Sequence, residues 1–74
     1  MKEITRQIER KIAVLSEERG GWLLELNMVS WNGYPPKFDI RRWSPDHSQT
    51  SKGVTLNECE AGLLLEALRK ELED

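Results

Sequence analysis

The sequence has few of the residues that small domains use to add stability to a small core. It contains a single cysteine, Cys59, so no disulfide can form within the chain. With a single histidine, His47, it also lacks the roughly four cysteine and histidine ligands of a structural zinc site. Because a chain of 74 residues buries a limited core, we expect a partner chain to contribute to its stability.

The sequence also lacks several features that would indicate a membrane protein or an enzyme. It has no apolar run near the roughly 20 residues that span a bilayer and no basic segment followed by an apolar leader, so we expect a cytosolic protein without membrane contact. No spacing suggests a nucleophile and base, and His47 lies in a polar loop where solvation is the expectation. The glycine pair at 20–21 fits a turn, not a phosphate cradle. We therefore expect no enzyme activity, metal, cofactor or small-molecule substrate.

Charge is unevenly distributed along the chain. The net charge is −2, but residues 1–56 carry nine lysines and arginines against seven acidic residues, whereas residues 57–74 carry two against six. An acidic total argues against strong nonspecific binding to duplex DNA, which normally accompanies a basic domain. It leaves room for a locally basic groove in the first part of the chain.

Hydrophobic periodicity does not decide the first element, at about residues 4–16. Ile4, Ile8 and Ile12 fit the stripe of a helix as well as one face of a strand. The enrichment in isoleucine and valine, and the glycine pair at 20–21 that follows, favour a strand. We predict a strand here and treat it as the least determined element.

Two clearer strands follow, at about residues 21–31 and 37–43. Both alternate between apolar and polar side chains, and Asn32-Gly33 between them is a strong turn pattern. The pair Pro35-Pro36 prevents the strand ladder from continuing without a break. One face of the first strand is wholly apolar and includes Trp22, so we predict that Trp22 belongs to the core.

A short strand at about residues 52–56 and a helix at about residues 58–72 complete the chain. Asn57 is a good N-cap, and Glu60 three residues later completes a capping-box pattern. The predicted fold is α+β: a single domain with a four-stranded antiparallel meander, followed by one C-terminal helix (ββββα) that covers the apolar face of the sheet.

The apolar stripe of the helix is wider than one sheet face would cover. A glycine inside the helix, Gly62, costs about 1 kcal/mol relative to alanine, which suggests that another element packs closely there. We predict a helix-mediated homodimer with Gly62, Leu63 and Ala67 at the interface. The alternative is a wide core helix in a monomer.

The strand face opposite the apolar one gathers aromatic, basic and polar side chains. Flat tryptophan rings stack on unpaired bases at about 1–3 kcal/mol per base, and arginine and lysine contact phosphates, so the pattern favours single-stranded nucleic acid. The alternative is that the tryptophans cover a sheet edge or a dimer seam. The residues on this face are Asn27, Trp31, Lys37, Arg41, Trp43 and Thr55, with Lys11 as a further candidate.

Two stretches of the sequence resemble a known family. Phe38-Asp39-Ile40-Arg41, followed by an aromatic residue and a polar loop, then Lys52-Gly53-Val54-Thr55-Leu56-Asn57 and an amphipathic helix, is similar to the positive-cofactor-four family of transcriptional coactivators. The stretch from Glu25 to Gly33, with Pro35-Pro36-Lys37 after it, resembles the small bacterial members of the YdbC type. The resemblance runs from about Gly21 to the C-terminus and fits the first 20 residues only loosely.

The resemblance implies homodimers joined through their helices, whose curved sheets bind single-stranded DNA with little sequence preference. By position, Arg41 and Lys52 match basic residues of the family's binding face, and Trp31 matches an aromatic. Two departures stand out: Trp43 is followed by Ser44 where the family has an aromatic pair, and only Lys37 remains of a lysine-rich turn.

From the residues and the resemblance together we expect a homodimeric protein that binds single-stranded DNA, or RNA, in the bacterial cytoplasm. Such a protein would act in transcription, replication or repair. The alternative is a protein–protein interaction module that docks through the sheet face or the acidic helix.

Overall fold

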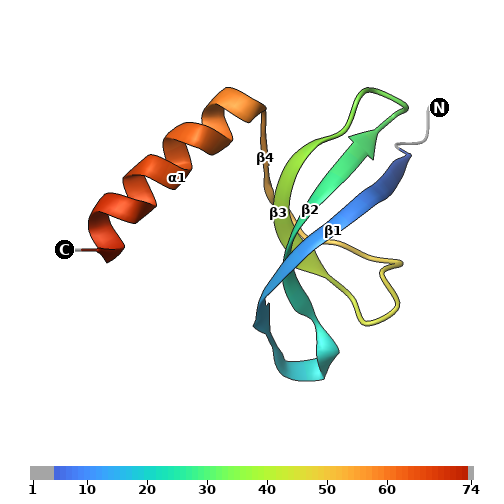
Figure 1. Ribbon diagram of the computed structural model, residues 1–74. Coiled ribbons are helices and arrows are strands. Elements are labelled where there is room, and N and C mark those ends of the chain that lie inside the picture. The colour runs from blue at the N-terminus through green and yellow to red at the C-terminus, as the bar shows by residue number, and fades with distance from the viewer. Residues whose placement is uncertain (1–4, 74) are drawn as a thin grey trace.

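The computed structural model describes residues 5–73 and has the predicted ββββα architecture (Figure 1). The strands pair antiparallel in the order β1-β2-β3-β4, so the sheet is a meander, and one helix follows it. The elements are β1 (Arg6–Glu17), β2 (Leu23–Trp31), β3 (Lys37–Trp43), β4 (Val54–Leu56) and α1 (Glu58–Leu72), with a short 3-10 turn (Arg19–Gly21) between β1 and β2.

The bounds of β3 and α1 agree with those predicted, and the other strands differ by a few residues. The 3-10 turn occupies the start of the predicted second strand, so β2 begins at Leu23. Lys52 and Gly53 precede β4 instead of belonging to it. Ile4, the first residue of the predicted first strand, lies outside the described residues.

Two local patterns are confirmed in detail. Asn32 and Gly33 have φ values of 51° and 78°, the left-handed region that the tight turn between β2 and β3 requires. At the start of α1, the Asn57 side chain accepts a hydrogen bond from the Glu60 backbone N–H at 2.8 Å. The Glu60 carboxylate in turn accepts from the Asn57 backbone N–H at 2.8 Å, which completes the capping box.

β1 is a strand whose pairing with β2 is interrupted three times. The register shifts between Ile8 and Arg10, between Lys11 and Ala13, and again before Ser16. Each bulge adds an unpaired residue and bends the strand. A regular period of two is therefore lost, which explains why the periodicity of this segment did not distinguish strand from helix.

The sheet has two faces of different chemistry, which we call the polar face and the apolar face. Residues directly opposite each other in an antiparallel pair share a face, so the register assigns each side chain. The polar face includes Arg6, Ile8, Lys11 and Val14 from β1, Leu23, Glu25, Asn27, Val29 and Trp31 from β2, Lys37, Asp39, Arg41 and Trp43 from β3, and Thr55 from β4. The apolar face includes Leu24, Leu26, Met28, Phe38, Ile40 and Leu56.

The most buried residues of the sheet lie on the polar face, whereas the sequence predicts that the apolar face is the buried one. Val29, Asn27 and Asp39 in the middle of this face are at most 1% exposed, and Glu25 is 3% exposed. The interpretation of the apolar face as the covered core of one chain is therefore wrong. Trp22 is only half-buried and precedes β2, so its assignment to the core is also wrong.

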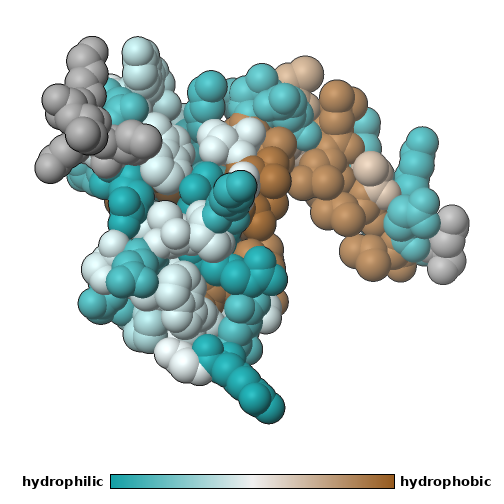
Figure 2. All heavy atoms as spheres, turned by 180° about the vertical axis from the view of Figure 1, so that it is seen from behind, coloured by the Kyte–Doolittle hydropathy of each residue, from teal (hydrophilic) through white to brown (hydrophobic). Residues whose placement is uncertain are grey.

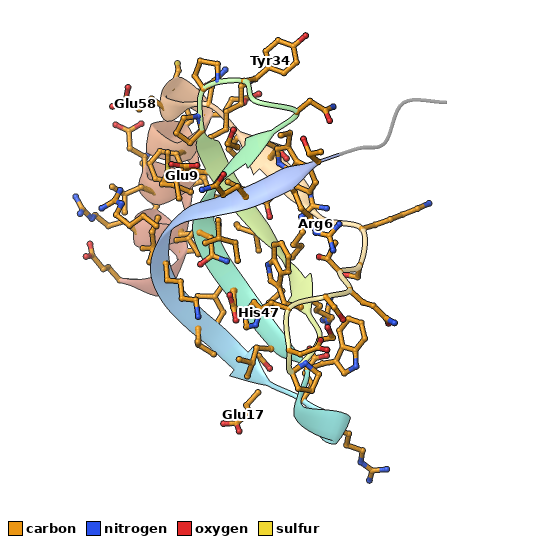
Figure 3. All side chains as sticks on the ribbon, turned by 90° about the vertical axis from the view of Figure 1, so that its right-hand side faces the viewer. Arg6, Glu9, Glu17, Tyr34, His47 and Glu58 are labelled. Atoms are coloured by element: carbon orange, nitrogen blue, oxygen red, sulfur yellow. The ribbon has the colours of Figure 1, made fainter. Side chains whose placement is uncertain are left out.

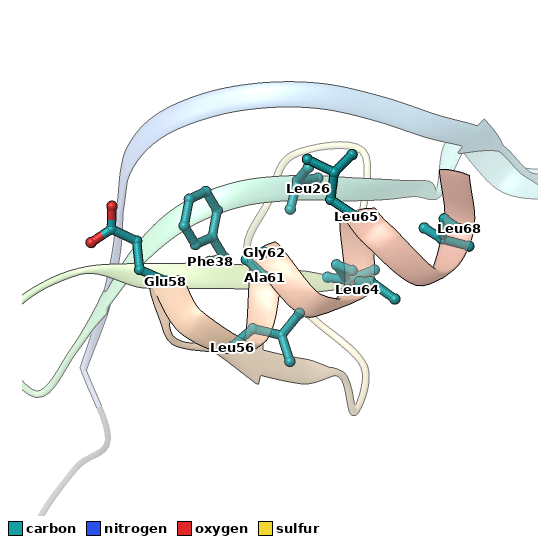
Figure 4. Close-up of a pocket in the computed structure, with 10 residues that line it drawn as sticks. Leu26, Phe38, Leu56, Glu58, Ala61, Gly62, Leu64, Leu65 and Leu68 are labelled. Atoms are coloured by element: carbon teal, nitrogen blue, oxygen red, sulfur yellow. The ribbon is translucent and has the colours of Figure 1, made fainter. Parts of the chain in front are cut away.

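The helix leaves the apolar face open. In Figure 1, α1 extends away from the sheet beyond β4, and none of its described residues is buried. Seen from behind in Figure 2, apolar side chains gather around the hollow between helix and sheet. A pocket of about 450 Å³ lies there (Figure 4). Its apolar lining comprises Leu26, Phe38, Ile40, Leu56, Ala61, Leu64, Leu65 and Leu68.

Candidate nucleic-acid interface

A buried carboxylate holds the arginine of the polar face in place. Asp39 is fully buried, and its Oδ1 accepts a hydrogen bond from Arg41 Nε at 2.7 Å. Its other oxygen accepts from the Thr55 hydroxyl at 3.1 Å, and Arg41 also donates to the Ser51 carbonyl at 3.2 Å. Because a buried charge is tolerated only when it is paired and hydrogen-bonded, Asp39 and Arg41 form one structural unit.

This unit places the Arg41 guanidinium against the indole of Trp31. Arg41 pairs with Glu25 in the register, and Trp31 lies six residues further along β2, so the two side chains extend toward each other along the face. They meet with the guanidinium carbon 4.5 Å from the ring centroid. Gly53 allows this packing, because a Cβ there would lie 2.4 Å from the Arg41 Cβ. The pair forms a cation–aromatic contact on the polar face.

Trp43 lies on the same face but is covered. Trp43 is 2% exposed. The His47 ring stacks on its indole with 5.6 Å between the ring centroids, and the Arg6 guanidinium carbon lies 5.6 Å from the centroid of the indole. The prediction of an open stacking surface at Trp43 is therefore wrong for the chain in this conformation. Trp31 remains half-buried. A direct contact between nucleic acid and Trp43 stays a prediction that requires the cover to move.

His47 is held by a second buried carboxylate, that of Glu25. His47 Nε2 lies 2.9 Å from Glu25 Oε2, and Asn27 Nδ2 donates to Glu25 Oε1 at 2.9 Å. The expectation of a solvated loop histidine is wrong, because the side chain is 24% exposed and contacts both Glu25 and Trp43. Asn27 is buried beneath the surface, so its predicted contact with nucleic acid would also require rearrangement.

Three buried polar atoms of this face have no hydrogen-bond partner among the described residues. They are Oδ1 of Asn27 and the indole Nε1 atoms of Trp31 and Trp43. A buried donor or acceptor without a partner is uncommon in folded proteins and calls for an explanation. All three belong to residues that the sequence predicted for the site.

Asp46 stabilises the loop between β3 and β4, which lies over Trp43, through hydrogen bonds. The Asp46 Oδ1 accepts hydrogen bonds from the Ser48 hydroxyl at 2.7 Å, the Ser44 hydroxyl at 2.9 Å and the Ser48 backbone N–H at 3.0 Å. These bonds, those from Ser48 foremost, lower the pKa of Asp46 from 3.8 to about 2. Arg6 Nη2 donates to the Ser48 carbonyl at 2.7 Å and ties the loop to β1.

The predicted lysines lie at the margins of this arrangement. Lys37, at the start of β3, and Lys52, before β4, are both exposed, as is Lys11 on β1. The structure thus brings Trp31, Arg41 and Thr55 into the network around Asp39. It leaves the exposed Lys37 and Lys52 outside this network.

Sequence reasoning missed Arg6 and His47. The bulges in β1 remove the parity that would have placed Arg6 on the polar face, and its contact with Ser48 spans 42 residues. The polar residues around His47 predict a solvated side chain, although Trp43, four residues earlier, offers it a stacking partner. Arg6 on β1 and His47 in the loop between β3 and β4 lie on the same side of the sheet (Figure 3).

Within residues 5–73, no group of three or more histidine, cysteine or acidic side chains is arranged to hold a metal ion. No helix in the same range is long and apolar enough to cross a membrane.

A comparison with known proteins places the chain in a family. No family model matches the sequence. A protein of Treponema pallidum (strain Nichols), described as an uncharacterized protein, is 48% identical over 62 residues, which cover 84% of this chain and 73% of that protein. With that identity over most of both sequences, the chain belongs to the same protein family as the Treponema pallidum protein.

Proposed function

We propose that this protein binds single-stranded nucleic acid on its polar face and does so as a homodimer. The observation that carries the proposal is the Arg41 guanidinium stacked on Trp31 at 4.5 Å and held there by the buried Asp39. Guanidinium and indole planes are the surfaces on which unpaired bases stack. The exposed lysines at the margins, Lys11, Lys37 and Lys52, supply charge for phosphates.

Single strands suit this face better than duplexes. Bases in a duplex are stacked on one another and would have to be separated before they could contact the Trp31 and Arg41 planes. The net charge of −2 also gives little attraction for the dense charge of duplex DNA. Stacking does not depend on base identity or on the sugar, so we expect little sequence preference and binding of both DNA and RNA. We place the activity in the cytoplasm, in transcription, replication or repair.

The homodimer proposal is supported by the open apolar face. Leu64, Leu65 and Leu68 line the pocket and are 37–55% exposed, while nothing in the described chain lies within 4 Å of a Cβ built at Gly62. A second copy of the helix could cover this surface and place the predicted interface residues Gly62, Leu63 and Ala67 in contact. Contiguous exposed apolar surface of this kind is typical of interaction sites.

Titration of the protein with oligo(dT), followed by tryptophan fluorescence at low salt, tests the nucleic-acid proposal. We expect quenching, and we expect Trp31→Ala to weaken binding by about 5- to 150-fold because one base loses its stacking partner. Trp31→Phe is the matched control and should retain most of the affinity. A wild-type chain that shows no quenching, or a Trp31→Ala variant that binds like the wild type, would contradict the proposal.

The open apolar face also supports a second candidate, a module that docks a different protein through the same leucines. The two candidates differ in what covers this face. If the chain sediments as a monomer and oligo(dT), oligo(U) and duplex all fail to bind at fixed salt, the docking module becomes the better account. Binding of oligo(dT) and oligo(U), but not duplex, by a dimer favours the first.

A further inference from the structure

A second basic cluster lies on the polar face, apart from Arg41. A pocket of about 370 Å³ is lined by Thr5, Arg6, Ile8, Trp43 and His47. Arg6 and His47 come from β1 and from the loop before β4, and both rest on the same buried indole of Trp43. The pocket therefore combines a guanidinium and an imidazole on a rigid aromatic base.

Both basic side chains are held in position by hydrogen bonds. Arg6 Nη2 is fixed by the Ser48 carbonyl at 2.7 Å, and His47 Nε2 by the Glu25 carboxylate at 2.9 Å. Glu25 is 3% exposed and is itself fixed by Asn27 Nδ2 at 2.9 Å. Groups that are already ordered lose less entropy when a ligand binds. This ordering is the property expected of a binding site rather than of a mobile surface loop.

The contact with Glu25 determines what His47 can offer a ligand. The carboxylate accepts a hydrogen bond, so neutral His47 carries its proton on Nε2 and presents a lone pair at Nδ1. Among the described residues, Nδ1 makes no hydrogen bond. A phosphate oxygen is an acceptor and would meet that lone pair unfavourably. When the imidazole is protonated, Nδ1 also becomes a donor and the ring carries positive charge.

We propose that Arg6 and His47 form a subsite for one phosphodiester group of the bound strand, and that protonation of His47 switches on the histidine's share of this contact. The inference rests on the proposed function, because the phosphate belongs to the single strand that stacks on Trp31 and Arg41. It adds to that function a dependence of affinity on pH and assigns the contact to two residues outside the predicted site.

We assign the dependence of affinity on pH to His47 rather than to the charged groups around it. Arg6 from β1 stays protonated, and Asp46 in the same loop stays ionised because its pKa is lowered to about 2. Glu25 from β2 is the hydrogen-bond partner of the ring, and Lys11 from β1 flanks Glu25 in a neighbouring pocket. His47 is the only histidine in the chain.

The dependence of oligo(dT) affinity on salt measures the number of phosphate contacts directly. Each contact to a single strand adds about 0.7 to the slope of log K against log salt concentration. We expect the wild-type slope to be steeper by up to about 0.7 at about pH 6 than at about pH 8. His47→Gln should remove this difference, and Arg6→Gln should make the slope shallower by about 0.7 at both pH values.

The control is Lys70→Gln on α1, which removes one positive charge away from the polar face and should leave the slopes unchanged. A wild-type slope that is the same at both pH values would overturn the inference while oligo(dT) binding itself still supports the proposed function. Tighter binding by His47→Gln at both pH values would also overturn it, because the ring would then be blocking the face. Absence of any oligo(dT) binding would remove both proposals. The comparison of the salt slopes at the two pH values uses the wild-type chain alone, so it tests the inference even if the His47→Gln variant does not fold.

Discussion

The two faces of the sheet are completed in different ways. On the polar face, Asp39, Glu25 and Trp43 are buried by side chains of the same chain, above all by Arg41, His47 and Arg6. On the apolar face, the leucines of α1 stand apart from the sheet around a pocket of about 450 Å³. Charged groups can pair with each other within one short chain, whereas apolar surface is removed from water only by more apolar surface. The chain thus supplies its own partners for the first face and leaves the second face open.

The largest effect should come from breaking the pair that organises the polar face. In Asp39→Ala, the Arg41 guanidinium, whose side chain is 13% exposed in the unsubstituted chain, loses its partner. We expect the free energy of unfolding to fall by about 3–5 kcal/mol. Urea unfolding at one fixed protein concentration measures it. Thr55→Val is the control: it removes only the 3.1 Å hydrogen bond to Asp39 and should cost about 1 kcal/mol. Equal losses in the two variants would contradict the role given to the ion pair.

Two glycines allow the faces to be compared directly. A Cβ at Gly53 would lie 2.4 Å from the Arg41 Cβ and from the Ile40 carbonyl oxygen, so Gly53→Ala should destabilise the chain by about 1–3 kcal/mol. A Cβ at Gly62 meets nothing within 4 Å in the described chain. If a second copy packs there, Gly62→Ala should weaken the dimer about tenfold. A gain of about 1 kcal/mol in stability with unchanged association would instead show a free helix face.

The smallest effect on stability should come from a substitution in the loop that covers Trp43. The pKa of Asp46 is lowered from 3.8 to about 2, so the stability it contributes is present above about pH 4 and is lost as the pH falls toward 2. We expect Asp46→Asn to lower the thermal midpoint slightly at neutral pH and to reduce its decline in acid. Thermal melts of both proteins across that range test this. Parallel declines in wild type and variant would show that Asp46 does not hold the loop.

The sequence predicted elements whose causes are local. The Asn57–Glu60 capping box, the Asn32-Gly33 turn and the alternation of Lys37–Trp43 are each contained in a few residues, and all are confirmed. The sides of the sheet were also assigned correctly for β2 and β3, because alternation and register agree.

Burial could not be predicted in the same way. Hydropathy alone equates apolar with buried, but Asp39 and Glu25 are buried because Arg41 and His47 pair with them. The cover over Trp43 depends on Arg6 reaching Ser48 across 42 residues of sequence, and the bulges of β1 are set by the folded sheet. Trp31 and Arg41 could be assigned to one face, but their contact at 4.5 Å is visible only in three dimensions.

The central claim is that the polar face binds a single strand while a second copy of the chain covers the apolar face. Sedimentation velocity of the protein mixed with fluorescently labelled oligo(dT), followed at the label's wavelength, tests both parts at once. We predict that the oligonucleotide moves with a protein species of twice the 8.6 kDa chain mass. Oligonucleotide that sediments alone, or with a single chain, would contradict the account.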